Sequence, residues 1–129
     1  MKSVTYANSK VYAGLTSQPL ADVLLTGPVK NVSFKGVLVD TGADHLQVPA
    51  GAATLAGWSV AAGKSITVGT VGGPMAMSLL KGATVEIEGV PVTVDLLCHP
   101  SATSRPLLGR SALRALKEVG FDLAGWLWL

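Results

Sequence analysis

The segment from Val37 to Asp44 constrains the fold of this chain more than any other part of the sequence. Its aliphatic residues, Val37 to Val39, favour β-structure and end at Asp40, which Thr-Gly-Ala follows. The pattern predicts a buried strand that breaks at its carboxyl end and leaves the Asp40 carboxylate partly out of water. Such a carboxylate is costly unless it accepts hydrogen bonds or shares a proton, which indicates a chemical role. For the tripeptide alone, an ordinary exit from strand to turn, with Asp40 bonded to the following amides, is the simpler interpretation.

The length and composition predict a single β-rich domain that spans residues 1–129. Hydrophobic residues make up 49% of the chain and charged residues 14%, so it is more apolar than an average soluble domain. This balance favours a fold with an additional surface to bury, such as an interface between subunits. No apolar run approaches the ~20 residues that span a bilayer, and the N-terminal segment lacks the apolar core of a secretory signal.

The charge and the cysteine content narrow the partners and the compartment. A formal net charge of +2, with Lys and Arg scattered along the chain, provides no basic stripe for a nucleic acid. We therefore expect neither nucleic acid nor membrane as a partner. The lone Cys98 excludes an intrachain disulfide and gives no sign of an oxidising compartment, so we expect a cytoplasmic protein with a buried, unreactive thiol.

Short strands and a short helix are predicted around the acid. Residues 20–26 and 32–36 form neighbouring strands on either side of a Gly-Pro turn. Residues 49–56 are rich in Ala, begin with proline and stop before a glycine, which is typical of a short helix. Residues 58–60 then return to extended chain.

Two hairpins are predicted in the middle of the chain. Residues 65–80 alternate around a tip with three glycines, and the two arms lack the charges of a solvated edge, so we expect this hairpin to cover another apolar surface. A plain glycine-rich turn is the alternative. Residues 84–97 form the second hairpin, in which Glu86 and Glu88 share a face that we interpret as solvated rather than catalytic.

The C-terminal part predicts one helix followed by a short pair of strands. Residues 111–119 carry an inward stripe of Leu113, Leu116 and Val119, and a glycine ends the helix. Residues 121–129 predict two short strands, and their two tryptophans share a face.

Four features, in this order, resemble the retropepsins, the single-domain, retroviral-type aspartic proteases. They are an apolar strand that ends in Asp-Thr-Gly-Ala-Asp, a glycine-rich hairpin about thirty residues later, a second apolar hairpin, and Leu-Leu-Gly-Arg at the start of a C-terminal helix. The resemblance covers residues 32–116 and is most specific at residues 39–44 and 107–110. It implies an all-β fold, a mostly antiparallel closed barrel with one C-terminal α-helix. The short helix after the catalytic loop is typical of bacterial and other cellular members.

The resemblance also implies an aspartic endopeptidase that acts on polypeptide substrates. Asp40 is the implied catalytic acid, and because the chain has one Asp-Thr-Gly, a second copy must supply the other acid in a homodimer. The paired carboxylates share one proton and activate a water between them, without a cofactor and with a mildly acidic optimum. The alternative is a retropepsin-like module that binds peptides or dimerises with little or no turnover.

The family pattern implies a role for each residue of the catalytic loop. Thr41 locks the two loops across the dimer axis, Gly42 lets the substrate backbone approach closely, and Ala43 completes the loop. Asp44 lies near the substrate main chain and forms an ion pair with Arg110 that braces the site.

The glycine-rich hairpin resembles the flap, which covers the active site in this family. Its tip, Val71, Gly72 and Gly73, is implied to bind substrate, with the Val71 amide directed at a water on the substrate carbonyls. Pro74 departs from the viral pattern. Because proline lacks an amide, it leaves open whether the flap is stiffer or shorter.

Other positions leave alternatives open. His45 either lines the substrate pocket and influences side-chain choice or is a surface residue beside a carboxylate. Residues 126–129 either contribute to the dimer interface or form an intrachain hairpin on the core. Asp40 and Asp44 together could hold a cation, but an ion pair with Arg110 explains Asp44 better, and we expect no metal site.

Overall fold

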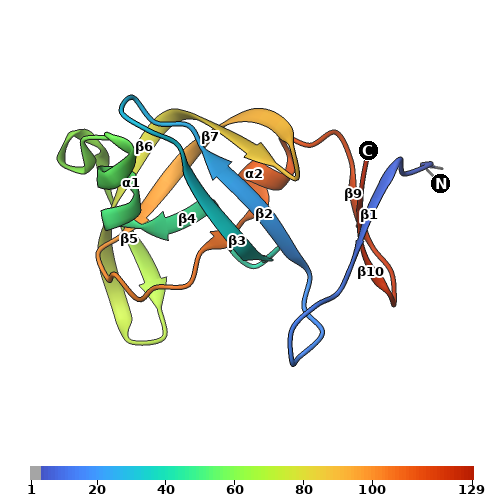
Figure 1. Ribbon diagram of the computed structural model, residues 1–129. Coiled ribbons are helices and arrows are strands. Elements are labelled where there is room, and N and C mark those ends of the chain that lie inside the picture. The colour runs from blue at the N-terminus through green and yellow to red at the C-terminus, as the bar shows by residue number, and fades with distance from the viewer. Residues whose placement is uncertain (1–3) are drawn as a thin grey trace.

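The computed structural model describes residues 4–129, and its main sheet has seven strands and curls into a barrel (Figure 1). Its strand order is β2-β3-β8-β4-β7-β6-β5, and β2 also pairs with β6, so the sheet closes on itself. The β3–β8 and β4–β7 pairings are parallel and the others are antiparallel. The predicted mostly antiparallel barrel is confirmed. The strands are β2 (Leu20–Leu25), β3 (Val32–Val39), β4 (Leu46–Pro49), β5 (Lys64–Thr70), β6 (Gly73–Ile87), β7 (Val90–His99) and β8 (Leu107–Leu108).

Residues 1–3, on which the expectation about a secretory signal partly rests, lie outside the described part of the chain. Within residues 4–129, no helix is both long enough and apolar enough to cross a membrane.

Burial along β3 determines where the chain leaves the core. Val37 and Val39 are 1% and 5% exposed, and they pack in the same core as the alternate residues of β2. A fully buried aliphatic side chain contributes ~1.5–3 kcal/mol relative to an exposed one. Because Val39 is held inside, the next residue, Asp40, starts the loop at the edge of the barrel.

The short helix predicted after this loop is present as α1 (Ala50–Ala56). It starts directly after Pro49 and ends at Gly57, whose φ of +101° is the left-handed conformation that glycine adopts most readily. Ala53 and Ala56 are fully buried and attach the helix to the barrel. A short 3-10 helix, η1 (Val60–Ala62), replaces the extended chain that the sequence predicts at residues 58–60.

The C-terminal helix α2 (Arg110–Leu113) is shorter than the predicted helix over residues 111–119. After Leu113, the amides of Ala115 and Leu116 donate to carbonyls three residues back, at 3.1 Å each, and the helix unwinds. The chain then becomes a strand because residues 119–121 pair with the C-terminal strand. Leu113 and Leu116 are buried as predicted for the inward stripe, whereas Val119, its third member, is partly exposed and belongs to β9.

A second, smaller sheet brings together an early strand and the last two strands of the described chain, in the order β1-β10-β9 (Figure 1). Its strands are β1 (Asn8–Val11), β9 (Val119–Phe121) and β10 (Gly125–Trp128). The rings of Trp126 and Trp128 stack with centroids 4.4 Å apart, and both side chains are buried. Trp126 Nε1 donates to the Leu20 carbonyl at 3.1 Å, so these tryptophans fasten the terminal sheet to the start of β2. The intrachain packing predicted as one alternative for residues 126–129 is present.

Glu88 ties the same sheet to the barrel and corrects one prediction. It occupies the β6–β7 turn with a φ of +48°. Its carboxylate accepts hydrogen bonds from Lys10 Nζ at 2.8 Å and from the Asp22 amide at 2.6 Å. The prediction that Glu88 belongs to a solvated strand face is therefore wrong, because non-local partners from β1 and β2 meet it at the turn.

Replacing Trp126 tests how the terminal sheet is held. We expect Trp126→Ala to lower the free energy of unfolding by about 3–5 kcal/mol, because it leaves a cavity in the core. Trp126→Phe keeps an aromatic ring and loses the hydrogen bond to Leu20, so it should cost about 1–3 kcal/mol. Urea unfolding followed by tryptophan fluorescence and circular dichroism measures both. Leu123→Ala, at a fully exposed turn position, is the matched control and should change little; equal stability of all variants would contradict this account.

Candidate active site

Asp40 follows the last residue of β3 and keeps one backbone hydrogen bond to the barrel. Its amide donates to the Leu108 carbonyl at 3.0 Å. Its carboxylate is half-exposed, and Oδ1 accepts the Gly42 amide at 2.9 Å. This is the bond expected for an ordinary turn, so the bond itself does not distinguish a structural acid from a catalytic one. The surroundings of the loop carry that distinction.

The start of α2 holds the loop from both sides. The Arg110 amide donates to the Ala43 carbonyl at 2.8 Å, and the Ser111 amide donates to the Asp44 carbonyl at 2.9 Å. The Arg110 guanidinium donates through Nη1 to the Thr41 carbonyl at 2.7 Å and forms an ion pair through Nη2 with Asp44 Oδ1. Both side chains are largely exposed, so the ion pair alone is worth little, about 0–1 kcal/mol. The backbone bonds provide most of the brace.

Gly109 allows this close contact between the loop and α2. A Cβ atom at this position would lie 2.4 Å from the His45 carbonyl oxygen and 2.7 Å from the Ala43 carbonyl oxygen. Both neighbours are backbone atoms, which cannot rotate away. Glycine is therefore required here because two backbone segments cross without room for a side chain.

A groove of about 840 Å³ lies between the loop and the β5–β6 hairpin. Asp40 and Asp44 line it from the loop, and Val71 lines it from the tip of the hairpin. Five apolar residues line the space between them: Ile66, Val68, Met77, Leu97 and Leu107. An extended peptide fits a groove of this kind because its backbone can pair with strand edges while its side chains enter alternating positions.

The hairpin reaches its tip with pairing intact. The β5–β6 register runs from Lys64↔Leu79 to Thr70↔Gly73, and Pro74 stands opposite Gly69 within it. Gly73 has a φ of +106°, and Thr70 Oγ1 donates to its carbonyl at 2.6 Å, which closes the turn. Pro74 therefore does not shorten the paired part of the hairpin.

Sequence comparison identifies the family. Residues 26–115 match the model of the gag-polyprotein putative aspartyl protease family, which covers more than half of the chain. The chain belongs to this aspartyl protease family. The match confirms the resemblance drawn from residues 32–116. A comparison with curated proteins finds no significant match.

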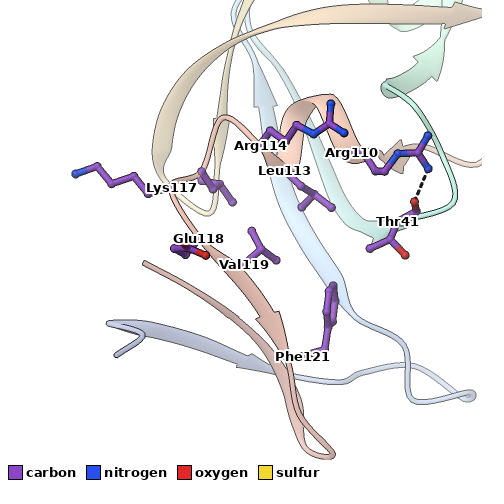
Figure 2. A pocket seen from close by; sticks show the side chains of 9 residues that line it. Thr41, Arg110, Leu113, Arg114, Lys117, Glu118, Val119 and Phe121 are labelled. Carbon is purple, nitrogen blue, oxygen red and sulfur yellow. Dashed lines mark hydrogen bonds between the residues drawn. The ribbon is translucent and has the colours of Figure 1, made fainter. Parts of the chain in front are cut away.

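In this member of the aspartyl protease family, the predicted site residues divide between two surfaces. Asp40, Gly42, Ala43 and Asp44 line the large groove. Thr41 and Arg110 line a separate, smaller groove on the other side of the loop (Figure 2). At the hairpin tip, Val71 lines the large groove and is fully exposed, whereas Gly72 lies in the turn and Gly73 is the first residue of β6. The catalytic and substrate-binding roles of these residues remain predictions.

Polar residues on the groove floor add to the predicted set. His45, Gln47 and His99 line the groove, and the sequence analysis singled out only His45. His45 Nδ1 lies 3.2 Å from Ser111 Oγ, so α2 also positions this ring. His99 Nδ1 accepts the Ser101 amide at 2.9 Å, which places the proton of the neutral ring on Nε2. The alternation along β4 was the available signal, because Leu46 and Val48 are buried and the intervening position must face the other way.

Cys98 and His99 are adjacent in sequence but do not form a reactive pair. Cys98 faces the core and burial raises its pKa to about 11, whereas the adjacent His99 faces the groove. The two side chains therefore point to opposite sides of β7. Within residues 4–129, no group of three or more His, Cys, Asp or Glu side chains is placed to hold a metal ion.

Replacing Gly109 tests the contact between loop and helix. We expect Gly109→Ala to lower the free energy of unfolding by about 1–3 kcal/mol, because the added methyl group displaces the backbone at His45. The control is Gly51→Ala in α1, where a Cβ meets open space and alanine favours the helix, so the stability should hold or rise. Thermal unfolding of both variants measures the difference. A Gly109→Ala protein as stable as the Gly51→Ala protein would refute the steric argument.

The reactivity of Cys98 provides an independent measure of its burial. With a pKa of about 11, its thiolate fraction at pH 8 is very small. We expect the folded protein to react with a thiol reagent at least about 100-fold more slowly than the same protein in urea. Stoichiometric labelling of the folded protein within the mixing time would contradict this prediction, because it would show that the Cys98 thiol is accessible to solvent.

Proposed function

We propose that this chain is an aspartic endopeptidase that works as a homodimer. The observation that carries the proposal is the placement of Asp40 and Val71 on one groove, in a chain with a single Asp-Thr-Gly. Membership of an aspartyl protease family supports the same chemistry. One copy supplies one carboxylate, and the second carboxylate comes from Asp40 of another copy.

The proposed reaction is general acid–base hydrolysis without an acyl-enzyme. One Asp40 accepts a proton from a water held between the two carboxylates, and the water attacks the scissile carbonyl carbon. The other Asp40 donates its proton to the carbonyl oxygen, and the resulting diol collapses as the amine leaves with a proton. Asp44 and Arg110 keep the loop in place through the bonds described above.

The groove supports an extended polypeptide as substrate. The hairpin side offers apolar contacts from Ile66, Val68 and Met77, which suit aliphatic and aromatic substrate side chains. The floor offers Gln47 and the Nε2 proton of His99, which suit an acceptor such as a carboxylate or amide. We therefore propose a mixed preference, with apolar residues favoured at some subsites and Glu, Asp, Gln or Asn at others.

The Asp40→Asn variant tests the reaction. We expect cleavage of a broad peptide library to fall by at least about 1,000-fold, because the amide can neither take nor give the required proton. Folding and assembly should be unchanged, since asparagine can still accept the Gly42 amide. Mass spectrometry of the cleaved library measures rate and preference together.

The matched control is Glu86→Gln, which neutralises a carboxylate outside the groove and should keep full activity. Full activity of Asp40→Asn would remove this acid from the mechanism. Peptide binding without cleavage by the wild-type chain would favour a binding module over a protease.

A further inference from the structure

Strand β6 contains a β-bulge at the point where it leaves the hairpin and enters the barrel. The register between β6 and β7 shifts there, so that Lys81 and Gly82 stand opposite a single residue of β7, Asp95. Before the bulge, β6 pairs with β5 and forms the hairpin; after the bulge, it pairs with β2 and closes the barrel (Figure 1). A bulge bends a strand and increases its twist. The β6 bulge therefore determines the direction in which the hairpin leaves the barrel.

The bulge also changes which side chains of β6 face the core. Before it, Met77 and Leu79 pack with Leu97 in a separate apolar cluster that reaches the large groove. After it, Ala83 and Val85 are buried in the main core. Residues of odd number thus face outward before the bulge and inward after it. Because side chains alternate along a strand, one additional residue is enough to produce this change.

The Asp95 carboxylate holds both residues of the bulge. Oδ1 accepts the Gly82 amide at 3.3 Å, and Oδ2 accepts Lys81 Nζ at 3.0 Å. The hydrogen bond from Lys81, followed by the bond from the Gly82 amide, lowers the pKa of Asp95. The ion pair is largely exposed and contributes little. The bond to the backbone amide matters more, because the additional residue of a bulge loses its regular place in the ladder and its amide needs another acceptor.

The same construction occurs a second time in the chain. The register between β2 and β3 shifts so that Lys35 and Gly36 stand opposite Asp22. The Gly36 amide donates to Asp22 Oδ1 at 3.2 Å, and Lys35 Nζ lies 3.7 Å from Oδ2. Gly36 and Gly82 have similar φ values, +65° and +70°. An aspartate that holds a Lys-Gly bulge is therefore a repeated device in this molecule, and the β3 bulge provides an internal reference for the β6 bulge.

The two bulges differ in what they carry. The hairpin beyond the β6 bulge contributes Ile66, Val68 and Val71 to the large groove. Among the described residues, β2, β3 and the turn between them contribute none. Loss of the bond at the β6 bulge should therefore affect the groove through the hairpin, whereas loss of the matching bond at the β3 bulge should not.

Asp95 also lies beside the end of the catalytic loop. β4 and β7 run in parallel, and their register continues back to place His45 next to Asp95. The charge of His45 contributes to the lowered pKa of Asp95, which agrees with this placement. His45 in turn lies 3.2 Å from Ser111 Oγ in α2. One carboxylate is thus in contact with the base of the hairpin and adjacent to a residue that α2 positions.

We propose that Asp95 is a positioning residue, which holds the β6 bulge and thereby sets the orientation of the β5–β6 hairpin over the large groove. Asp95 itself does not line the groove, so it acts through the hairpin. A small rotation at the bulge is amplified at Val71, because the hairpin extends as one paired unit from its base to its tip. The effect on the hairpin is independent of catalysis. The effect on substrate rests on the proposed function.

The first test measures the hairpin without any substrate. Residual dipolar couplings of the backbone amides, recorded by NMR, give the orientation of the hairpin relative to the barrel. We expect Asp95→Ala to make the couplings of residues 64–79 depart from the wild-type orientation, while the couplings of the barrel strands still fit it. Asp22→Ala, which removes the matching bonds at the β3 bulge, is the matched control and should leave the hairpin couplings unchanged.

The second test measures cleavage of the peptide that the wild-type chain cleaves best. We expect Asp95→Ala to raise KM at least about fivefold, the loss that corresponds to one hydrogen bond, with kcat changed by less than about twofold. This division is expected because hairpin contacts bind substrate and transition state alike. Asp95→Asn keeps an oxygen that accepts the Gly82 amide, so it should restore part of the loss, and it carries both tests if Asp95→Ala does not fold. Asp22→Ala should leave KM unchanged.

The outcomes separate the role of Asp95 from the proposed function. Unchanged hairpin couplings in both Asp95 variants would overturn the positioning role. An equal rise in KM for Asp22→Ala would also overturn it, because it would show an effect of general stability. A fall in kcat at constant KM would overturn it too, since the effect would then not pass through substrate binding. If the couplings respond as expected but the wild-type chain cleaves no peptide, the positioning of the hairpin stands and the protease is wrong.

Discussion

The geometry of the candidate site depends on the contact between the Asp40 loop, residues 40–44, and the start of α2. At Gly109 two backbone segments approach so closely that no side chain fits, and amides of Arg110 and Ser111 satisfy carbonyls of the loop. Backbone bonds of this kind hold a loop more rigidly than side chains can, because few torsions remain free. The exposed ion pair of Arg110 and Asp44 orients these two side chains but contributes little to the free energy of unfolding. The position of Asp40 is thus set by a packing constraint more than sixty residues away in the sequence.

Local patterns predicted the parts of the fold that short-range chemistry determines. The strand that ends at Asp40, the helix before Gly57 and both hairpins follow from alternation, proline and glycine within a few residues. The length of α2 could not be predicted in this way. Its sequence supports a longer helix, but pairing of Val119 with the C-terminal strand competes with helical bonds and wins. The prediction for Glu88 was wrong for the same reason, since its partners Lys10 and Asp22 come from distant strands.

The candidate site shows the same division. Asp40, Asp44 and Arg110 could be placed from their motifs, because each motif carries a loop or helix start that positions its own side chains. Gln47 and His99 reach the groove only because β4 and β7 pair in parallel, with Pro49 opposite His99. Nothing in either segment alone indicates that pairing. The polarity of the groove floor, which bears on the proposed substrate preference, therefore depends on the register of the sheet and not on any motif.

The placement of β10 between β1 and β9 has a consequence for how an active molecule would form. Because β1 and β9 pair with β10 within one protomer and buried tryptophans fasten this sheet to the barrel, the protomer can complete its folding before it meets another copy. Association of two copies is then a separate step that takes place between folded protomers. Under the proposed dimer mechanism, activity at low concentration would rise with the square of the amount of protein. Under that mechanism, the local concentration of the protein would set the fraction of copies that are active.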